Sequence, residues 1–143
     1  MHIPKEQSSP VPKYVPQITR GRVVKVYDGD TITIIGRVMY NPRLFTFQIR
    51  LNDIDCPELR SKDPVEKEMA TIAKNFLSDI IYEKMVVLKV TGLDKYGRLL
   101  AHVYHDGVQL NDLMLTNRLA VKYDGGTKQS PADWKKYHES TLN

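Results

Sequence analysis

The sequence predicts a single, mainly β domain of the α+β class, in which five short strands close into a Greek-key barrel with two or three short-to-medium helices. Three observations predict it. β-Branched and aromatic residues recur in five short runs, an amphipathic helix separates the third run from the fourth, and 143 residues are enough for one hydrophobic core but not two. Hydrophobic residues make up 41% and charged residues 27%, as in an ordinary globular domain.

The first two strands are predicted to form a hairpin. β-Branched residues alternate with other types on both sides of Asp28-Gly29, at Val24 and Val26 before the pair and at Ile32 and Ile34 after it. Asp-Gly between two alternating runs is a strong hairpin signal, because both residues tolerate the backbone of a tight turn.

A third strand and the clearest helix follow. The alternating run 44–51 predicts the strand. A helix is then predicted over about 64–81. Asp63 is a favourable N-cap, Pro64 suits the first helical position, and Glu66 completes a capping pattern. The apolar face of this helix is predicted to consist of residues at helical spacing: Val65, Met69, Ile72, Ala73, Phe76, Leu77 and Ile80.

The rest of the chain predicts two more strands and two short helices. The strands are expected at 85–90 and 99–104, a helix at 111–117, and a final helix that starts at Ser130-Pro131 and carries Trp134. Three strands, a helix, two strands and short helices suit a closed Greek-key barrel such as the OB-fold. Another small α+β domain is the alternative.

Residues 1–18 hold four prolines among polar residues, which predicts a mobile N-terminal arm before a single domain at 19–143. No apolar run approaches the roughly 20 residues that cross a membrane, and the N-terminus lacks the apolar stretch of a signal peptide. We therefore expect a cytoplasmic monomer with no membrane partner. Secretion stays open as an alternative if an export signal was removed.

Charge and cysteine content narrow the function classes. The formal net charge of +4 fits a polyanionic partner such as nucleic acid. Cys56 is the only cysteine, which excludes an intrachain disulfide and a zinc site built from thiolates alone.

Two acidic pairs are candidates for metal binding. Asp28 and Asp30 flank Gly29, and Asp55 and Glu58 flank Cys56-Pro57. An ordinary hairpin turn and a solvated loop are the simpler interpretations of these segments. Asp30, however, opens a β-branched strand, where Asp is a poor strand former. If Asp30 and Asp55 meet at one end of the barrel, their charges repel, and a hard cation such as Ca²⁺ resolves the conflict. A carbonyl, waters and a substrate phosphate oxygen would complete its coordination.

Two arginines are candidates for phosphate binding, because a guanidinium group matches a phosphate with two parallel hydrogen bonds and keeps its proton. Arg50 lies in the third predicted strand, and Arg98 starts the fifth. Arg50 and Asp55 are five residues apart, on opposite faces of a regular strand. A shared site therefore predicts a bend or bulge near Asn52 or Asp53. A surface arginine without a function is the alternative at each position.

Together these residues resemble the staphylococcal nuclease (thermonuclease) family. The matching pieces follow in order, at approximately the family's spacing, over about 22–123. They are Asp28-Gly29-Asp30-Thr31, Arg50, Asp55-Cys56-Pro57-Glu58, Asp94-Lys95-Tyr96-Gly97-Arg98, Leu119-Ala120 and Tyr123. The resemblance implies an OB-type barrel and Ca²⁺-dependent endonucleolytic hydrolysis of DNA and RNA, which leaves 3′-phosphates, with single strands preferred.

The resemblance also implies roles for individual residues. Asp30 and Asp55 correspond to the carboxylate ligands of Ca²⁺, with the main-chain carbonyl of Cys56 beside them. The positions that correspond to catalytic residues are Arg50 and Arg98, as the phosphate-binding pair, and Glu58, which activates or orients water. The positions that correspond to the nucleotide pocket are Lys95, Tyr96 and Tyr123.

Three other functions compete with this one. A non-catalytic OB-type module could bind nucleic acid without cutting it. A sugar hydrolase could use Asp55 and Glu58 as an acid/base pair, although Arg50 and Arg98 would then have no role. A Cys56 nucleophile could act with a histidine such as His102 or His105.

Overall fold

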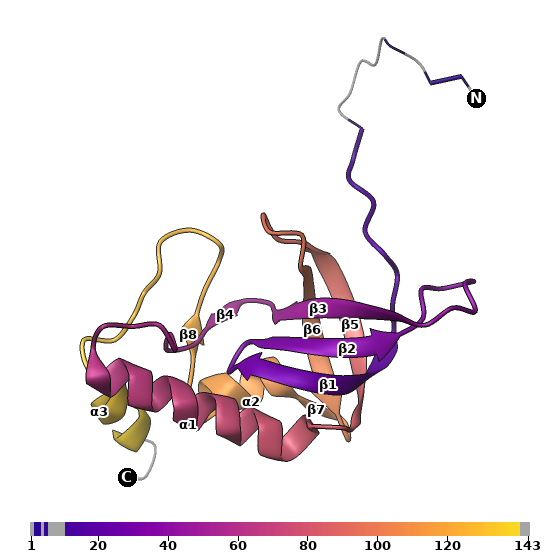
Figure 1. Cartoon of the computed structure of the whole chain (residues 1–143). Helices are drawn as coiled ribbons and strands as arrows, with labels where there is room; N and C mark the ends of the chain where they lie inside the picture. The colour runs from indigo at the N-terminus through magenta and orange to yellow at the C-terminus, as the bar shows by residue number, and fades with distance from the viewer. Residues whose placement is uncertain (1, 4, 6–10, 141–143) are drawn as a thin grey trace.

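The structure is a computed structural model that describes residues 2, 3, 5 and 11–140. In chain order the elements are β1 (Arg20–Asp28), β2 (Thr31–Gly36), β3 (Phe45–Leu51), β4 (Ile54–Asp55), α1 (Pro64–Ile81), β5 (Met85–Leu93), β6 (Leu99–His105), β7 (Val108–Gln109), α2 (Leu110–Thr116), β8 (Val121–Lys122) and α3 (Trp134–Glu139). Figure 1 shows their arrangement.

Five of these strands close into a barrel. The neighbours in the order β3, β2, β1, β5 and β6 pair antiparallel, and β3 completes the ring by pairing parallel with β6. Closure removes the exposed edges that would otherwise invite pairing with other chains. The predicted OB-type barrel of five strands, with a helix between the third and fourth, is confirmed, and the described residues form three helices.

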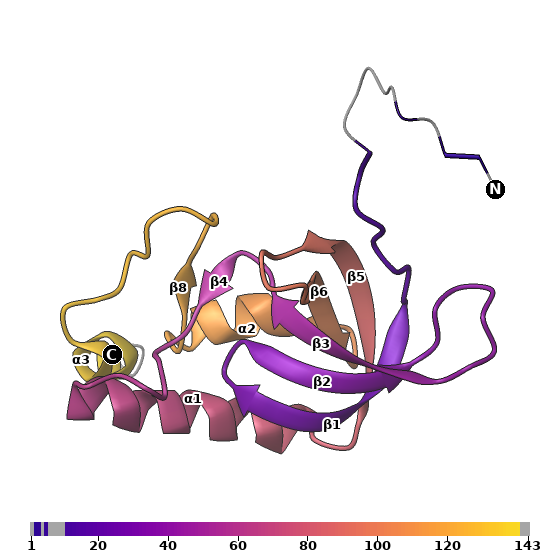
Figure 2. The same ribbon diagram turned by 45° about the horizontal axis from the view of Figure 1, so that its top comes forward.

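Aliphatic side chains fill the barrel from every strand. Ile32, Ile34, Ile49 and Leu51 are completely buried, and each such side chain contributes roughly 1.5–3 kcal/mol on transfer from water. Helix α1 lies along β1 and packs its apolar stripe on this core (Figure 2). The buried residues of that stripe are Met69, Ala70, Ala73, Leu77 and Ile81.

Helix α1 spans the predicted residues, with one change at its cap. The Asp63 carboxylate accepts a hydrogen bond from the Val65 amide at 3.0 Å, so the predicted N-cap is confirmed. Glu66 does not complete a capping box. Its carboxylate instead accepts from the Glu58 amide at 2.9 Å, and so ties the loop after β4 to the helix. The predicted apolar face is wrong at Ile72, which is 38% exposed.

Three elements differ most from the prediction. The final helix begins at Trp134, not at Ser130, because Asp133 caps it by accepting from the amides of residues 135 and 136. Strand β5 runs on to Leu93 in its pairing with β6. The two-residue strand β4, which pairs with β8, was not predicted.

The predicted arm also ends earlier than expected, because Ile18 is buried in the core at 2% exposure. Residues 1, 4 and 6–10 of the arm lie outside the described residues, and its mobility stays a prediction. Among the described residues, no helix is long and apolar enough to cross a membrane.

A tight turn at Asn52 and Asp53 separates β3 from β4, as the spacing of Arg50 and Asp55 predicted. Asp53 has a φ of +67°, a left-handed conformation that Asp adopts more readily than most residues. The turn is held from outside, because the Tyr123 amide donates to the Asp53 carbonyl at 2.9 Å and the Asn111 side chain donates to the Asn52 carbonyl at 2.8 Å. The turn reverses the pleat and brings Arg50 and Asp55 to one side.

Candidate active site

The first acidic pair lies at the hairpin between β1 and β2, where Asp28 ends β1 and Asp30 is in the turn rather than in the strand that it was predicted to open. Asp30 is 6% exposed, and its carboxylate accepts from the Thr31 hydroxyl at 3.1 Å and from the Cys56 amide at 3.0 Å. The Asp28 carboxylate accepts from the Asp30 amide at 3.0 Å. A Cβ at Gly29 would lie 2.8 Å from the Cys56 sulfur and 3.0 Å from the Ala73 Cβ. Glycine therefore lets the acidic turn pack directly against the second acidic segment.

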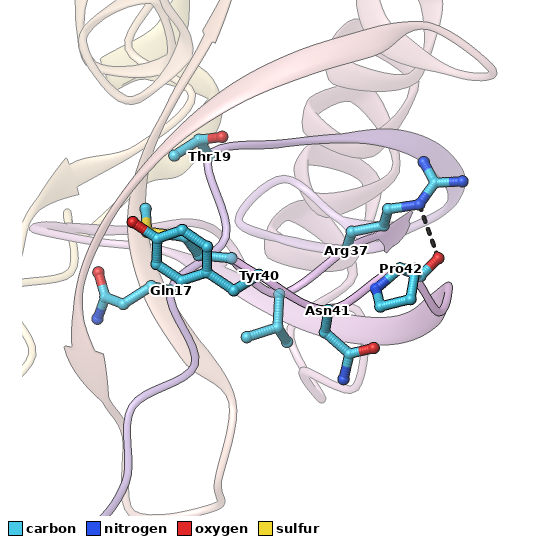
Figure 3. A pocket seen from close by; sticks show the side chains of 8 residues that line it. Gln17, Thr19, Arg37, Tyr40, Asn41 and Pro42 are labelled. Atoms are coloured by element: carbon cyan, nitrogen blue, oxygen red, sulfur yellow. Dashed lines mark hydrogen bonds between the residues drawn. The ribbon is translucent and has the colours of Figure 1, made fainter.

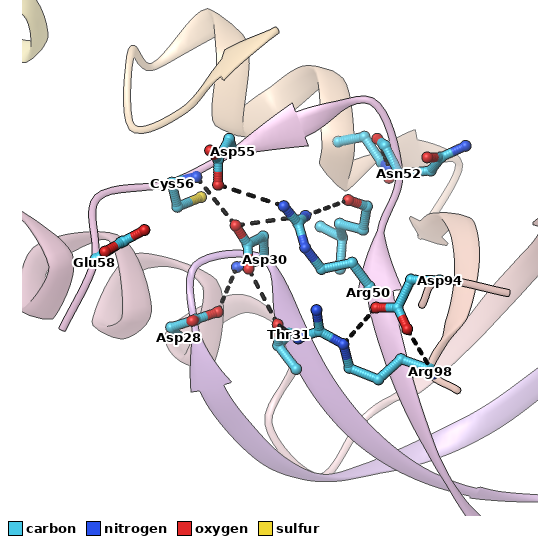
Figure 4. Close-up of polar contacts among 12 residues, drawn as sticks. Asp28, Asp30, Thr31, Arg50, Asn52, Asp55, Cys56, Glu58, Asp94 and Arg98 are labelled. Atoms are coloured by element: carbon cyan, nitrogen blue, oxygen red, sulfur yellow. Dashed lines mark hydrogen bonds and ion pairs between the residues drawn. The ribbon is translucent and has the colours of Figure 1, made fainter. Parts of the chain in front are cut away.

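Arg50 joins the two acidic segments. One of its terminal nitrogens lies 3.4 Å from the Asp30 carboxylate, and the other lies 3.4 Å from the Asp55 carboxylate (Figure 4). The same guanidinium group donates to the Leu51 carbonyl at 2.8 Å. Asp30 and Asp55 are thus on the same side of the molecule, as the hypothesis of a shared site requires. The cation between them is the Arg50 guanidinium group, whereas the sequence hypothesis placed a metal ion there.

Arg98 approaches the same cluster from the start of β6. Its Nε lies 2.6 Å from the Asp94 carboxylate, and one terminal nitrogen reaches the Thr31 hydroxyl at 3.4 Å (Figure 4). Burial alone would raise the pKa of Asp94, but hydrogen bonds from the Arg98 backbone and side chain lower it. Asp94 therefore stays ionised and holds the guanidinium group beside Thr31, whose hydroxyl donates to Asp30.

The remaining predicted residues gather around one cleft of about 560 Å³. Tyr96 is 72% exposed at its rim, with the Lys95 ammonium 5.2 Å and the Arg98 guanidinium 5.4 Å from the centre of its ring. The predicted site residues that line the cleft are Arg50, Asp55, Glu58, Lys95, Tyr96, Arg98 and Tyr123. Asp30 and Cys56 lie buried behind it.

The family model described as "Staphylococcal nuclease homologue" matches residues 48–140 of this sequence. The chain belongs to the staphylococcal nuclease family. The match covers the segment that carries Arg50, Asp55, Glu58 and Arg98.

Three curated relatives carry nuclease names. An "Uncharacterized endonuclease" of Haemophilus influenzae is 36% identical over 102 residues, or 71% of this chain and 51% of the relative. An "Uncharacterized endonuclease" of Escherichia coli O157:H7 is 30% identical over 105 residues, or 73% and 61%. A "Micrococcal nuclease" of Shigella flexneri is 30% identical over 129 residues, or 84% and 67%. This staphylococcal nuclease family chain thus spans about half to two thirds of these relatives.

Sequence reasoning missed Lys128 in this nuclease-family site. The Lys128 ammonium lies 3.4 Å from the Asp55 carboxylate and 3.3 Å from both the Glu58 carboxylate and the Cys56 carbonyl. Burial lowers the pKa of Lys128, but the charges of Asp55 and Glu58 outweigh it and raise the pKa overall. Lys128 lies in a long loop, more than 70 residues from Cys56, and no local pattern around it predicts the contact.

Burial and neighbouring charges raise the pKa values of two carboxyl groups at the site. Burial, followed by the nearby charge of Asp30, raises the pKa of Asp28 to about 7. Burial also raises the pKa of Asp55, although Lys128 and Arg50 oppose it. Within the described ranges, no group of three or more His, Cys, Asp or Glu side chains could hold a metal ion by themselves. In this family member the cations of Arg50 and Lys128 lie among the carboxylates instead.

The Cys56 nucleophile of the competing hypothesis does not fit this nuclease-family site. The thiol is buried at 2% exposure, and burial, reinforced by Asp30, raises its pKa well above the ordinary value. His102 contacts Asp53 at 2.9 Å, and His105 contacts the Met85 carbonyl at 3.1 Å. Both histidines are therefore engaged with other groups, and Cys56 packs against the acidic turn.

Proposed function

We propose that the chain is a calcium-dependent endonuclease that hydrolyses the phosphodiester bonds of DNA and RNA and leaves 3′-phosphates. The observation that carries the proposal is the Arg50 guanidinium group between Asp30 and Asp55, with Arg98 anchored beside it in the same cleft. Membership of the staphylococcal nuclease family and the nuclease names of the relatives support it.

The residues present fit a calcium ion. We propose that Asp30, Asp55 and the Cys56 carbonyl would hold it, because all three offer the hard oxygen donors that Ca²⁺ prefers. The Lys128 ammonium, which contacts Asp55 and that carbonyl, supports the assignment, because a cation already lies against these oxygens. When bound, Ca²⁺ would stabilise the charge that develops on the phosphate and make a bound water more acidic.

Arg50 and Arg98 would bind the non-bridging oxygens of the scissile phosphate. The contacts of Arg50 with both carboxylates are long, at 3.4 Å, and Nη1 is also held by the Leu51 carbonyl at 2.8 Å, so Nη2 is the terminal nitrogen that can turn to a phosphate at small cost. Asp94 holds the Nε of Arg98 and leaves the terminal nitrogens to face the cleft. Both groups would stabilise the charge of the pentacoordinate transition state, and one such donor is typically worth about 3–4 kcal/mol.

Glu58 is positioned to act on the attacking water. Its side chain is 64% exposed, while its backbone amide is fixed by the Glu66 carboxylate. Glu58 would take a proton from the water or orient it, and cleavage of the bond from phosphorus to the 5′-oxygen would leave the phosphate on the 3′ side.

The rim of the cleft would bind the nucleotides beside the scissile bond. Lys95 offers its ammonium to a phosphate, and the exposed ring of Tyr96 and the ring of Tyr123 offer faces for base stacking. Stacking needs a base that is out of the duplex, so we propose a preference for single strands. All of these residues belong to one chain, which is consistent with action as a monomer.

A digestion assay tests this function. Purified protein is incubated with single-stranded DNA, duplex DNA and RNA in Ca²⁺, in Mg²⁺ and in chelator. Cleavage is expected in Ca²⁺ and not in chelator, with product ends that a polymerase extends only after phosphatase treatment. Binding of the same substrates without cleavage in any ion would contradict the proposal and support the non-catalytic OB-type module.

Replacing Glu58 by Gln is expected to lower kcat by about 10²- to 10⁴-fold, the usual range for a general base, with little change in KM. Steady-state cleavage of a fluorogenic oligonucleotide measures both constants. Glu68→Gln, on the exposed face of α1, is the matched control and should leave both constants unchanged. Equal losses in binding and turnover would show that Glu58 is structural.

Replacing Lys128 by Met is expected to tighten Ca²⁺ binding about fivefold to tenfold. The change removes an ammonium group that pairs with two carboxylates, each pair being worth up to about 1 kcal/mol. Titration calorimetry measures the affinity, and Lys135→Met on α3 is the control for loss of one charge. An unchanged or weaker affinity would mean that Lys128 does not compete for the proposed cation position.

A further inference from the structure

The outer face of β1, β2 and β3 leads from the cleft to the opposite end of the barrel. Cross-strand pairing places Asp28, Thr31 and Arg50 side by side at the cleft end. The β2–β3 loop lies at one end of the barrel and β4 with β8 at the other (Figures 1 and 2). The five-residue step from Thr31 to Gly36 along β2 covers roughly 17 Å at the usual rise of a strand.

The outward-facing residues between the two ends are polar or basic except for the half-buried Ile35. The next row of cross-strand neighbours is Lys25, Thr33 and Gln48, and the row after it is Arg22, Ile35 and Thr46. All six are exposed or half-buried, while the alternate residues of the same strands face the core. Beyond Asp28, these two rows contain no acidic residue, so the face presents only neutral and positive groups.

The far end of this face carries a basic groove, which we define by Arg20, Arg22, Arg37 and Leu44. These residues line one pocket, and none of its lining residues is acidic. None of the ion pairs found among the described residues includes any of these three arginines, or Lys25. Like charges kept together without an acidic partner favour a polyanionic ligand.

An exposed aromatic side chain adjoins the basic groove. Tyr40 is 99% exposed on the β2–β3 loop, where its φ of +66° is a left-handed conformation that a tyrosine rarely adopts. Figure 3 shows Tyr40 and Arg37 at the same pocket, with the Arg37 Nε donating to the Pro42 carbonyl at 3.0 Å. An exposed aromatic ring in the pocket next to the basic groove suits a nucleic-acid strand, because phosphates pair with the cations of the groove and a base stacks on the ring.

We infer that a single strand of nucleic acid runs from the cleft along the outer face of β1, β2 and β3 and is held at the basic groove, with one base on Tyr40. The inference rests on the proposed function, because the same substrate strand would occupy both the cleft and the groove. The groove then retains long substrates without taking part in the chemistry.

The test variant combines three substitutions in the groove: Arg20→Gln, Arg22→Gln and Arg37→Gln. The control variant removes three positive charges from exposed positions of α1 and α3: Lys67→Gln, Lys135→Gln and Lys136→Gln. In chelator, fluorescence anisotropy with a 20-nucleotide single strand is expected to show about tenfold weaker binding for the arginine variant alone. The slope of log affinity against log salt should fall by about 2, because each phosphate contact on a single strand contributes about 0.7. In Ca²⁺, KM should rise for the 20-nucleotide substrate and stay unchanged for a dinucleotide, with kcat unchanged for both.

A second variant, Tyr40→Ala, tests the same site with little effect on the fold, because a side chain this exposed makes no core contacts. It should weaken binding of the long strand about fivefold and leave the dinucleotide KM unchanged. Unaltered binding of the long strand by both variants would overturn the inference, whereas cleavage of the dinucleotide would still support the proposed function. If no variant cleaves any substrate, the anisotropy measured in chelator still shows whether the groove binds the strand. Loss of binding to anionic phospholipid vesicles, with oligonucleotide binding intact, would assign the groove to a membrane surface and also overturn the inference.

Discussion

Replacing Arg50 or Arg98 by Ala is expected to lower kcat/KM for nucleic-acid cleavage by about 10²- to 10³-fold, which is the usual cost of removing one donor to a transition-state charge. Each guanidinium group is held at the cleft by carboxylates, Arg50 by Asp30 and Asp55 and Arg98 by Asp94. An alanine removes a preorganised donor and leaves these carboxylates to repel the phosphate. Initial rates on a short fluorogenic oligonucleotide measure the effect.

Arg50→Ala also removes the cation between two carboxylates, so a loss of fold must be separated from a loss of chemistry. Arg50→Lys keeps the charge but cannot form two parallel hydrogen bonds, and a smaller loss of about tenfold to 100-fold is expected for it. Lys89→Ala, on the exposed side of β5, is the charge control, and thermal unfolding of all variants checks the fold. Near-wild-type rates in folded Arg50→Ala or Arg98→Ala protein would contradict the proposed phosphate contacts.

Replacing Asp30 by Asn is expected to weaken Ca²⁺ binding at least about 30-fold, or about 2 kcal/mol, because calcium affinity depends strongly on the number of ligand charges. Asp30 is nearly buried, so solvent screens its charge little. The change also removes one acceptor from the bonds with Thr31 and the Cys56 amide, which loosens the alignment of the acidic turn. Titration calorimetry measures the affinity directly, without reliance on activity.

The control for Asp30→Asn is Asp79→Asn, an exposed carboxylate on α1 that should leave calcium affinity unchanged. A second readout is the pKa of Asp28, which the charge of Asp30 helps to raise. The Asn variant should therefore lower the pKa of Asp28 in calcium-free protein, as NMR titration would show. Unchanged calcium affinity in the Asn variant would remove Asp30 from the proposed ligand set.

Several features follow from local rules and were predictable. The hairpin of β1 and β2 and the Asp63 cap of α1 depend on residues that are neighbours in the chain, and both are confirmed, although the turn of the hairpin consists of Gly29 and Asp30 rather than Asp28 and Gly29. The turn at Asn52 and Asp53 was predictable because a regular pleat could not place Arg50 and Asp55 on one side. Alternation and helical spacing identified most of the core, since burial on one face follows directly from the period of the element.

Other features could not be predicted, because they depend on contacts that form only in the folded chain. Glu66 has the spacing of a capping-box residue, yet it binds the Glu58 amide, because tertiary packing brings that loop within reach. The contacts of Lys128 with Asp55, Glu58 and the Cys56 carbonyl join segments about 70 residues apart, and no periodicity encodes such a pair.

The residue types that carry the chemistry, the order of the elements and the N-cap of α1 thus depend on short stretches of sequence, where steric and hydrogen-bonding preferences act between near neighbours. Pairing of β2 with β3, together with the turn at Asn52 and Asp53, decided that Asp30 and Asp55 share Arg50, and pairing of β1 with β2 placed the arginines of β1 and of the β2–β3 loop along one groove. Strand pairing over long separations sets these distances, and the free energy that selects it comes from burial of the whole core rather than from any local segment.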